Sequence, residues 1–133
     1  MKSEYINYFN EKISMIKNII KIDVPIYPAD HEQIKGHEKA LGICYGYKND
    51  NGKMDVEKIT IDDYFIEENY EAEINGKWWM LHFVGQNLVD VVCHEIAHIY
   101  EWRHGKKHKE ITQCLIELVN TRMSRNQIQR GAA

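Results

Sequence analysis

The sequence predicts an α+β fold in a single domain that spans residues 1–133. Apolar side chains recur at helical spacing near the N-terminus, a central stretch alternates as β-strands do, and two more helical patterns follow. Hydrophobic residues make up 44% of the chain, which is enough to form one core. We therefore expect an N-terminal helix, a small antiparallel or mixed β-sheet, a helix that carries a histidine motif and a C-terminal helix.

The first helix is expected over residues 3–21. Its apolar side chains follow one another in steps of four, four, three and four, which keeps them on one face. These side chains are Tyr5, Phe9, Ile13, Ile16 and Ile20. Pro25 and Pro28 then end the pattern and favour an extended connector, because proline fixes φ and has no N–H to donate.

The β-sheet is expected between residues 41 and 62. Residues 41–47 form an apolar, β-like run, and Asn51-Gly52 favours the left-handed conformations of a tight hairpin. Residues 56–62 alternate as a second strand, which is either an ordinary strand or an exposed edge that an extended peptide could join. Residues 64–66 either extend this strand or begin a short third element.

A second helix is expected over residues 86–103. Its core stripe consists of Leu88, Val92, Ile96 and Ile99, and a separate polar flank holds Asp90, His94, His98 and Glu101. His104-Gly105 ends this helix, because glycine readily adopts the left-handed conformation that is common just past a helix C-terminus. The last helix, over residues 107–125, is expected to bury Ile111, Cys114, Leu115, Leu118 and Val119.

The remaining cysteine, tryptophan and histidine residues are assigned structural roles. No C-x-x-C pair is present, and we expect a buried reduced thiol at Cys44, Cys93 and Cys114. The expected core or cleft-wall tryptophans are Trp78, Trp79 and Trp102. Three histidines without ligand spacing to one another are expected to be structural or exposed: His31, His37 and His82.

The stretch His94-Glu95-Ile96-Ala97-His98 predicts a metal site with catalytic potential. Positions i and i+4 share one face of a helix, so His94 and His98 can present two imidazoles to one metal ion, with Glu95 beside it as a general base. Catalytic zinc usually takes three protein ligands and leaves a fourth position for water. His104 is well placed as the third ligand, because Gly105 lets the chain turn back, and the competitors are His108 and Glu117.

Together with His104-Gly105-Lys106-Lys107-His108, this motif resembles the SprT-like zinc metallopeptidases, whose signature is H-E-x-x-H followed by H-G-x-x and an aromatic residue or histidine. The resemblance implies a zincin-like fold, a Zn²⁺ cofactor held by His94, His98 and His104, Glu95 as the catalytic residue, and a protein or peptide substrate. The N-terminal helix, small sheet, motif helix and closing helix follow a similar layout.

Further residues are assigned supporting roles if the site is catalytic. A ligating histidine usually donates its second N–H to a carboxylate or a backbone carbonyl, and Asp90 and Glu101 are the nearby carboxylates. Peptide hydrolysis also needs a donor to the oxyanion, for which the candidates are Tyr100, His108 and Tyr45. His108 could equally contact substrate.

Three other functions remain open. A YbeY-type endoribonuclease shares the three-histidine spacing but does not use a glutamate after the first histidine. A regulatory peptidase resembling the ImmA/IrrE group would use a downstream glutamate, for which Glu117 is the candidate. A non-catalytic zinc-binding module would close its site with four ligands, including His108.

The net charge and the hydropathy of the chain limit the kinds of partner that we expect it to bind. The formal net charge is −3, so no basic field draws the chain to nucleic acid or to a membrane surface. The N-terminus has no apolar signal-peptide core, and the apolar runs are too short to span a membrane. We expect a cytoplasmic protein, of an oligomeric state that the sequence leaves open.

Overall fold

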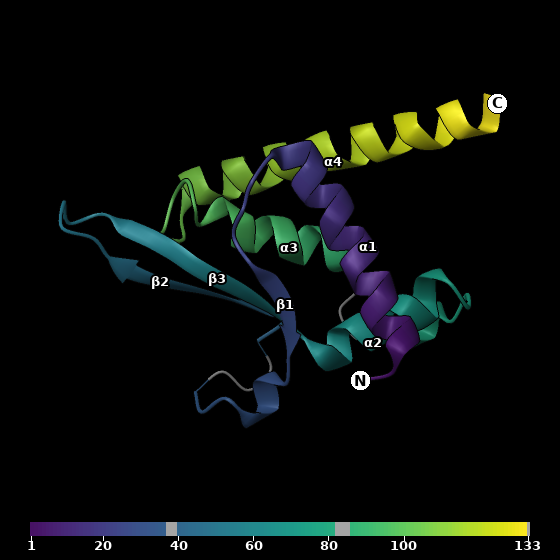
Figure 1. Cartoon of the computed structure of the whole chain (residues 1–133), viewed down its shortest axis with the longest axis horizontal. Helices are drawn as coiled ribbons and strands as arrows, with labels where there is room; N and C mark the ends of the chain where they lie inside the picture. The colour runs from purple at the N-terminus through teal and green to yellow at the C-terminus, as the bar shows by residue number, and fades with distance from the viewer. Residues whose placement is uncertain (37–39, 82–85, 133) are drawn as a thin grey trace.

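The computed structural model of the chain describes residues 1–36, 40–81 and 86–132, with side chains up to Arg125. Within these residues the fold is α+β, as predicted from the sequence, with a small mixed sheet of three strands and four α-helices, one more than predicted (Figure 1). The elements are α1 (Ser3–Ile20), β1 (Ile26–Ala29), β2 (Gly42–Lys48), β3 (Met54–Asp62), α2 (Asp63–Glu73), α3 (Leu88–Ala97) and α4 (Lys106–Ala132), with 3₁₀ turns η1 (His31–Gln33) and η2 (Trp78–Met80).

The helix α1 confirms the predicted N-terminal helix. Its buried side chains are Tyr8, Phe9, Ile13 and Ile16, which follow the helical spacing of the sequence. Lys21 ends the helix in the left-handed conformation at φ 63°, and its N–H bonds to the carbonyl of Lys17. The Tyr8 hydroxyl donates to Glu73 Oε2 at 2.7 Å, which ties α1 to α2.

The three strands lie in the order β1-β3-β2, with β1 parallel and β2 antiparallel to β3. The predicted hairpin is present, and Gly52 takes φ 77° in the loop that joins β2 to β3. The proline-bounded connector forms β1. An exposed edge at residues 56–62 is wrong for the part from Ile59 to Ile61, because those residues pair with β1 on one side and β2 on the other.

Of the two alternatives for residues 64–66, the strand does not continue and a further element begins, the eleven-residue helix α2. The Asp62 side chain accepts from the N–H of Phe65 at 3.3 Å and so caps a helix directly after β3. Phe65 and Ile66 then face the core and are buried. The apolar triplet that resembled a strand is therefore the first turn of an amphipathic helix.

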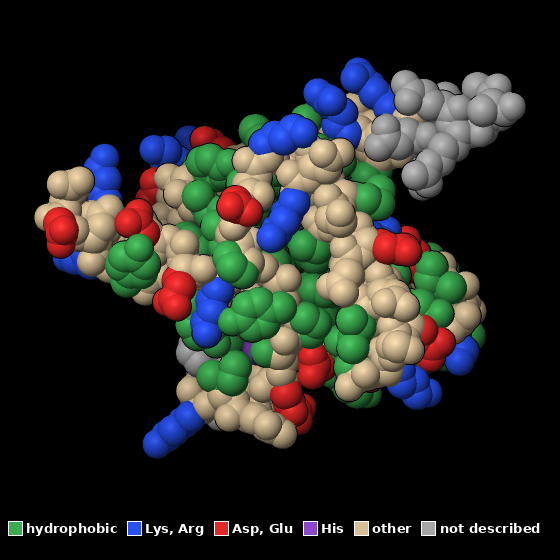
Figure 2. All heavy atoms as spheres, viewed as in Figure 1, with side chains coloured by type: hydrophobic (Ala, Val, Ile, Leu, Met, Phe, Trp, Pro, Cys, Tyr) green, Lys and Arg blue, Asp and Glu red, His purple; other side chains and the backbone are tan. Residues whose placement is uncertain are grey.

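One hydrophobic core joins the helices to the sheet. It includes Phe9 and Ile16 of α1, Ile59 and Ile61 of β3, and the buried side of α3. On the face drawn in Figure 2, positive and negative side chains are interspersed among exposed hydrophobic ones. None of the helices in the described ranges is both long and apolar enough to cross a membrane.

Four side chains that were expected to be buried are exposed. Trp78 and Trp79 are 63% and 79% exposed, because they lie in the short turn η2 at the surface, although Trp78 also lines a cavity, as a cleft-wall residue would. Cys114 and Leu118 lie one turn apart on the outer face of α4. The inward face of that helix instead carries His108, Leu115 and Val119, spaced by seven and four residues.

Candidate metal centre

The helix α3 begins with a capping box and ends inside the histidine motif. Asn87 accepts from the N–H of Asp90 at 2.9 Å, and Asp90 Oδ2 accepts from the N–H of Asn87 at 3.0 Å. The predicted helix over residues 86–103 is therefore too long, because α3 stops at Ala97. From His98 the backbone tightens: the N–H of His98 bonds to the carbonyl of Glu95 at 3.1 Å, three residues back.

This early end releases backbone carbonyls for the histidine rings. In a continuing α-helix the carbonyl of His94 would accept from the N–H of His98, but here it accepts from Nε2 of His108 at 2.9 Å. Nδ1 of His98 donates to the carbonyl of Trp102 at 2.7 Å. Each bond fixes a tautomer, which leaves Nε2 of His98 and Nδ1 of His108 with a free lone pair.

The turn after α3 brings a third and a fourth histidine to the motif pair. One nitrogen from each of His94, His98, His104 and His108 lies within 4.8 Å of the others. The sequence-predicted ligands are therefore together, and the competitor His108 lies with them. His98 and His108 are buried, whereas His94 and His104 are more exposed.

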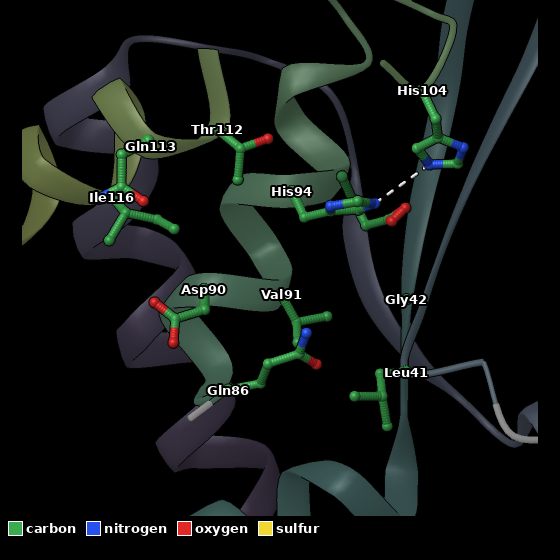
Figure 3. Close-up of a pocket in the computed structure, with 11 residues that line it drawn as sticks. Leu41, Gly42, Gln86, Asp90, Val91, His94, His104, Thr112, Gln113 and Ile116 are labelled. Carbon is green, nitrogen blue, oxygen red and sulfur yellow. Dashed lines mark hydrogen bonds between the residues drawn. The ribbon is translucent and has the colours of Figure 1, made fainter. Parts of the chain in front are cut away.

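The spacing of these nitrogens fits a transition metal. Nε2 of His94 and Nε2 of His104 are 3.3 Å apart, and the two rings face one another in Figure 3. Two nitrogens that are bound to one tetrahedral zinc ion lie about 3.3–3.4 Å apart. His98 offers its Nε2 from the same helix face as His94. These three histidines can therefore hold one ion, and imidazole nitrogen suits several transition metals.

The electrostatics of the site favour neutral imidazoles. Burial lowers the pKa of His94 to about 4, with a further lowering from His108, His98 and His104. Burial also lowers the pKa of His98, as does the proximity of His108. Only the neutral imidazole donates a lone pair to a metal, so the site favours the form that can bind one.

Glu95 lies beside the histidines and is 5% exposed. Its Oε1 is 4.0 Å from Nε2 of His98, and burial raises the pKa of its carboxyl to about 7. No described residue donates a hydrogen bond to this carboxylate. Glu95 is thus a buried acid beside a donor set that could hold a metal ion, which is an environment that suits a general base.

Gly42 is a site residue that the sequence reasoning missed. A Cβ at this position of β2 would lie 2.7 Å from Cγ of Glu95 and 3.1 Å from a methyl group of Val91. Only glycine therefore allows the strand to lie against the glutamate. A glycine inside a β-strand often marks such a close approach, and that was the available signal.

Two cavities meet at Glu95. The first has a volume of about 610 Å³ and lies between α3, α4 and the start of β2. Figure 3 shows its lining: Asp90 and Val91 on α3, Thr112, Gln113 and Ile116 on α4, and Leu41 before β2. The second has a volume of about 430 Å³ and is lined by residues that include Ile43, Cys44, Trp102 and Arg103. Gly42, Glu95 and His104 line both cavities.

The other predicted site residues are placed as follows. Asp90 uses its carboxylate in the capping box, and Glu101 pairs with Lys107 at 3.7 Å, so neither carboxylate orients a ligand histidine in this structure. Tyr100 is 52% exposed, and neither it nor Tyr45 is among the described residues that line the two cavities. Glu117 lies outside the group of converging ligand atoms.

His31 and Cys93 are buried, in agreement with the structural roles expected for them. His31 is fully buried, and its Nε2 lies 2.8 Å from the Thr60 hydroxyl, so it is structural as expected. His37 and His82 lie outside the described residues. Cys93 is buried as expected, and burial raises the pKa of its thiol to about 12.

In comparisons with known proteins, no family model, curated protein or solved structure matches this chain. The function is therefore argued from the geometry of the site.

Proposed function

We propose that this chain is a zinc-dependent peptidase of the SprT-like type. The observation that carries the proposal is the convergence of His94, His98 and His104 beside the buried carboxylate of Glu95. Both features lie where two cavities meet, so a substrate can reach them. A histidine cluster that served only to stabilise the fold would not need an open approach.

The three ligands would be His94, His98 and His104, through their Nε2 atoms. The hydrogen bond from Nδ1 of His98 to the carbonyl of Trp102 holds that ring in the tautomer that a metal requires. When bound in such a site, zinc would lower the pKa of a water molecule and polarise the substrate carbonyl.

Glu95 would move the proton. Its carboxylate accepts a proton from the attacking water and delivers it to the nitrogen of the leaving amine, as a general base and then a general acid. Its burial raises the pKa of the carboxyl to about 7, which suits both steps near neutral pH. Gly42 leaves the space in which the carboxylate lies.

The free edge of β2 supports an extended peptide as the substrate. In the described sheet, β2 pairs with β3 alone, so its other side is open for strand addition. Gly42, in this strand, lies against Glu95. A peptide that joined β2 would therefore bring its backbone past the glutamate.

The test compares wild type with Glu95→Gln after both have been reconstituted with zinc. Peptide hydrolysis should fall by about 10²–10⁴-fold in the variant, because a positioned acid–base group contributes on that order. The zinc content should stay equal, because Glu95 is not a ligand. The exposed Glu110→Gln is the matched control and should keep full activity. Hydrolysis that survives Glu95→Gln would refute the proposal.

One observation favours a second function, a closed zinc site without catalysis. His108 lies in the same cluster, and four imidazoles around one ion would leave no position for water. The hydrogen bond from Nε2 of His108 to the carbonyl of His94 leaves Nδ1 as the atom that would complete such a site. A zinc-loaded wild type that cleaves no peptide, and loses zinc in both His104→Ala and His108→Ala, would establish the closed site.

A further inference from the structure

We propose that Arg103 selects substrates that carry a carboxylate next to the scissile bond. This inference rests on the proposed peptidase function and names the chemistry of its substrate. The carboxylate would enter the second cavity, and an apolar side chain would enter the first.

Within the described part of the chain, Arg103 is a cation without an ion-pair partner at the site. It lines the second cavity together with Glu95, His98 and His104. No carboxylate among the described residues pairs with Arg103, whereas the nearby Lys107 is held by Glu101 at 3.7 Å. A guanidinium presents parallel N–H donors that match the two oxygens of a carboxylate. It is therefore available to a ligand that brings one.

The chain on both sides of Arg103 is anchored. Trp102 packs against Gly46 of β2, where a Cβ would lie 2.7 Å from the indole ring, and the Trp102 carbonyl accepts from His98. His104 follows directly and belongs to the histidine cluster. Because both neighbours are fixed, the backbone of Arg103 is held at the cavity, and less order has to be gained when a ligand binds.

The two cavities differ in charge. Among its described lining, the first contains the carboxylate of Asp90 and no lysine or arginine, and its apolar side chains are Leu41, Val91 and Ile116. A substrate carboxylate there would be repelled and would lack a partner. The second contains Arg103. A substrate carboxylate therefore gains an ion-pair partner in the second cavity only.

The strand β2 sets the register of the substrate. Leu41 lines the first cavity, Gly42 lines both, and Ile43 and Cys44 line the second. A peptide that runs beside this strand advances about 3.3 Å per residue and passes Glu95 at Gly42. The carboxylate therefore belongs one or two residues from the scissile bond. An aspartate or glutamate side chain and a free peptide C-terminus both provide this group.

The experiment measures kcat/KM of the zinc-loaded protein on three matched peptides. One carries an internal glutamate and blocked ends, one has glutamine in its place, and one has glutamine and a free C-terminus near the cleavage position. The variants are Arg103→Gln, Arg103→Lys and Arg103→Glu. The control is Arg122→Gln, an exposed arginine on α4 that lines neither cavity.

Wild type should prefer a carboxylate-bearing peptide over the blocked glutamine peptide by about tenfold or more, the scale of a charge-assisted hydrogen bond. Arg103→Gln should remove the preference, Arg103→Lys should keep part of it, and Arg103→Glu should reverse it, so that the blocked glutamine peptide is cleaved faster than either carboxylate-bearing peptide. Faster cleavage of the internal glutamate peptide identifies a side chain as the source, and faster cleavage of the free-end peptide identifies the C-terminus.

Equal cleavage of all three peptides by wild type, or a preference that Arg103→Gln leaves unchanged, would overturn this inference and leave the peptidase intact. Failure of the zinc-loaded wild type to cleave any peptide would overturn the proposed function, and this inference with it. The affinities of the same peptides for zinc-loaded Glu95→Gln distinguish failure of this inference from failure of the proposed function. If Arg103 selects a carboxylate, the preference must appear in peptide binding as well as in cleavage.

Discussion

Backbone carbonyls decide which ring nitrogen two of the four site histidines offer. His98 donates Nδ1 to Trp102, and His108 donates Nε2 to His94. The i and i+4 spacing of the sequence identified His94, Glu95 and His98 correctly as neighbours. It could not choose between His104 and His108, because that choice depends on a loop and on a hydrogen bond to main chain. His104 lies in the more exposed part of the cluster, whereas His108 is buried and also bonds to the main chain.

These two histidines should respond differently to truncation. His104→Ala should lower zinc affinity by at least about tenfold and leave the metal-free fold intact, because the side chain is exposed. His108→Ala should instead destabilise the metal-free protein by about 1–3 kcal/mol, because it removes a buried hydrogen bond. Zinc titration and chemical unfolding of both variants make the comparison. A His108→Ala protein that loses zinc and keeps its stability would contradict it.

At the scale of elements, the loop between α3 and α4 determines whether His104 can lie beside His94. A helix that continued to Arg103 would carry His104 away from His94, since each residue advances about 1.5 Å along the axis. The observed helix stops at Ala97, and the following turn folds back. The apolar pattern continues to Ile99, so the sequence gives no periodicity signal for the stop. The side-chain contact that anchors the turn, Trp102 on Gly46, joins elements distant in sequence.

Trp102→Ala should therefore loosen the site without touching a ligand. Zinc affinity should fall by about 10–100-fold, as for other groups that orient ligands, because the loop bearing His104 loses its contact with β2. Trp79→Ala is the matched control, since this side chain is 79% exposed and should leave affinity unchanged. Zinc competition with a chromogenic chelator measures both variants. Equal losses in the two would contradict the anchoring role.

The whole molecule is a helical layer packed on a small sheet, and its class was predictable. Helical spacing identified α1 and α4, and alternation with a turn signal identified β2 and β3. The helix α2 was missed because its first turn contains three apolar or aromatic residues in a row, and only the Asp62 cap marks it as a helix. The parallel pairing of β1 with β3 was missed because it joins segments about thirty residues apart.

The contact between α1 and α2 predicts how stability changes at high pH. Burial raises the pKa of Tyr8 well above its ordinary value of 10.0, as does its bond to Glu73. Between pH 10.0 and the higher folded pKa, the unfolded chain binds fewer protons than the native one, so stability is present below pH 10.0 and falls as pH rises above it.

Thermal unfolding from pH 8 to pH 11 tests this for wild type, Tyr8→Phe and the exposed control Tyr47→Phe. At pH 8, Tyr8→Phe should be less stable by about 1 kcal/mol, because a hydrogen bond is lost. Its disadvantage should shrink above pH 10, whereas Tyr47→Phe should follow wild type throughout. A constant difference between wild type and Tyr8→Phe across the range would show that Tyr8 does not contribute to the alkaline loss.

The most direct measurement of the metal centre is anomalous scattering at the zinc edge from crystals grown with zinc. We expect one peak, about 2.0–2.1 Å from Nε2 of His94, His98 and His104, with the Glu95 carboxylate near but not bound. Zinc held by all four histidines, or no peak at this cluster, would contradict it.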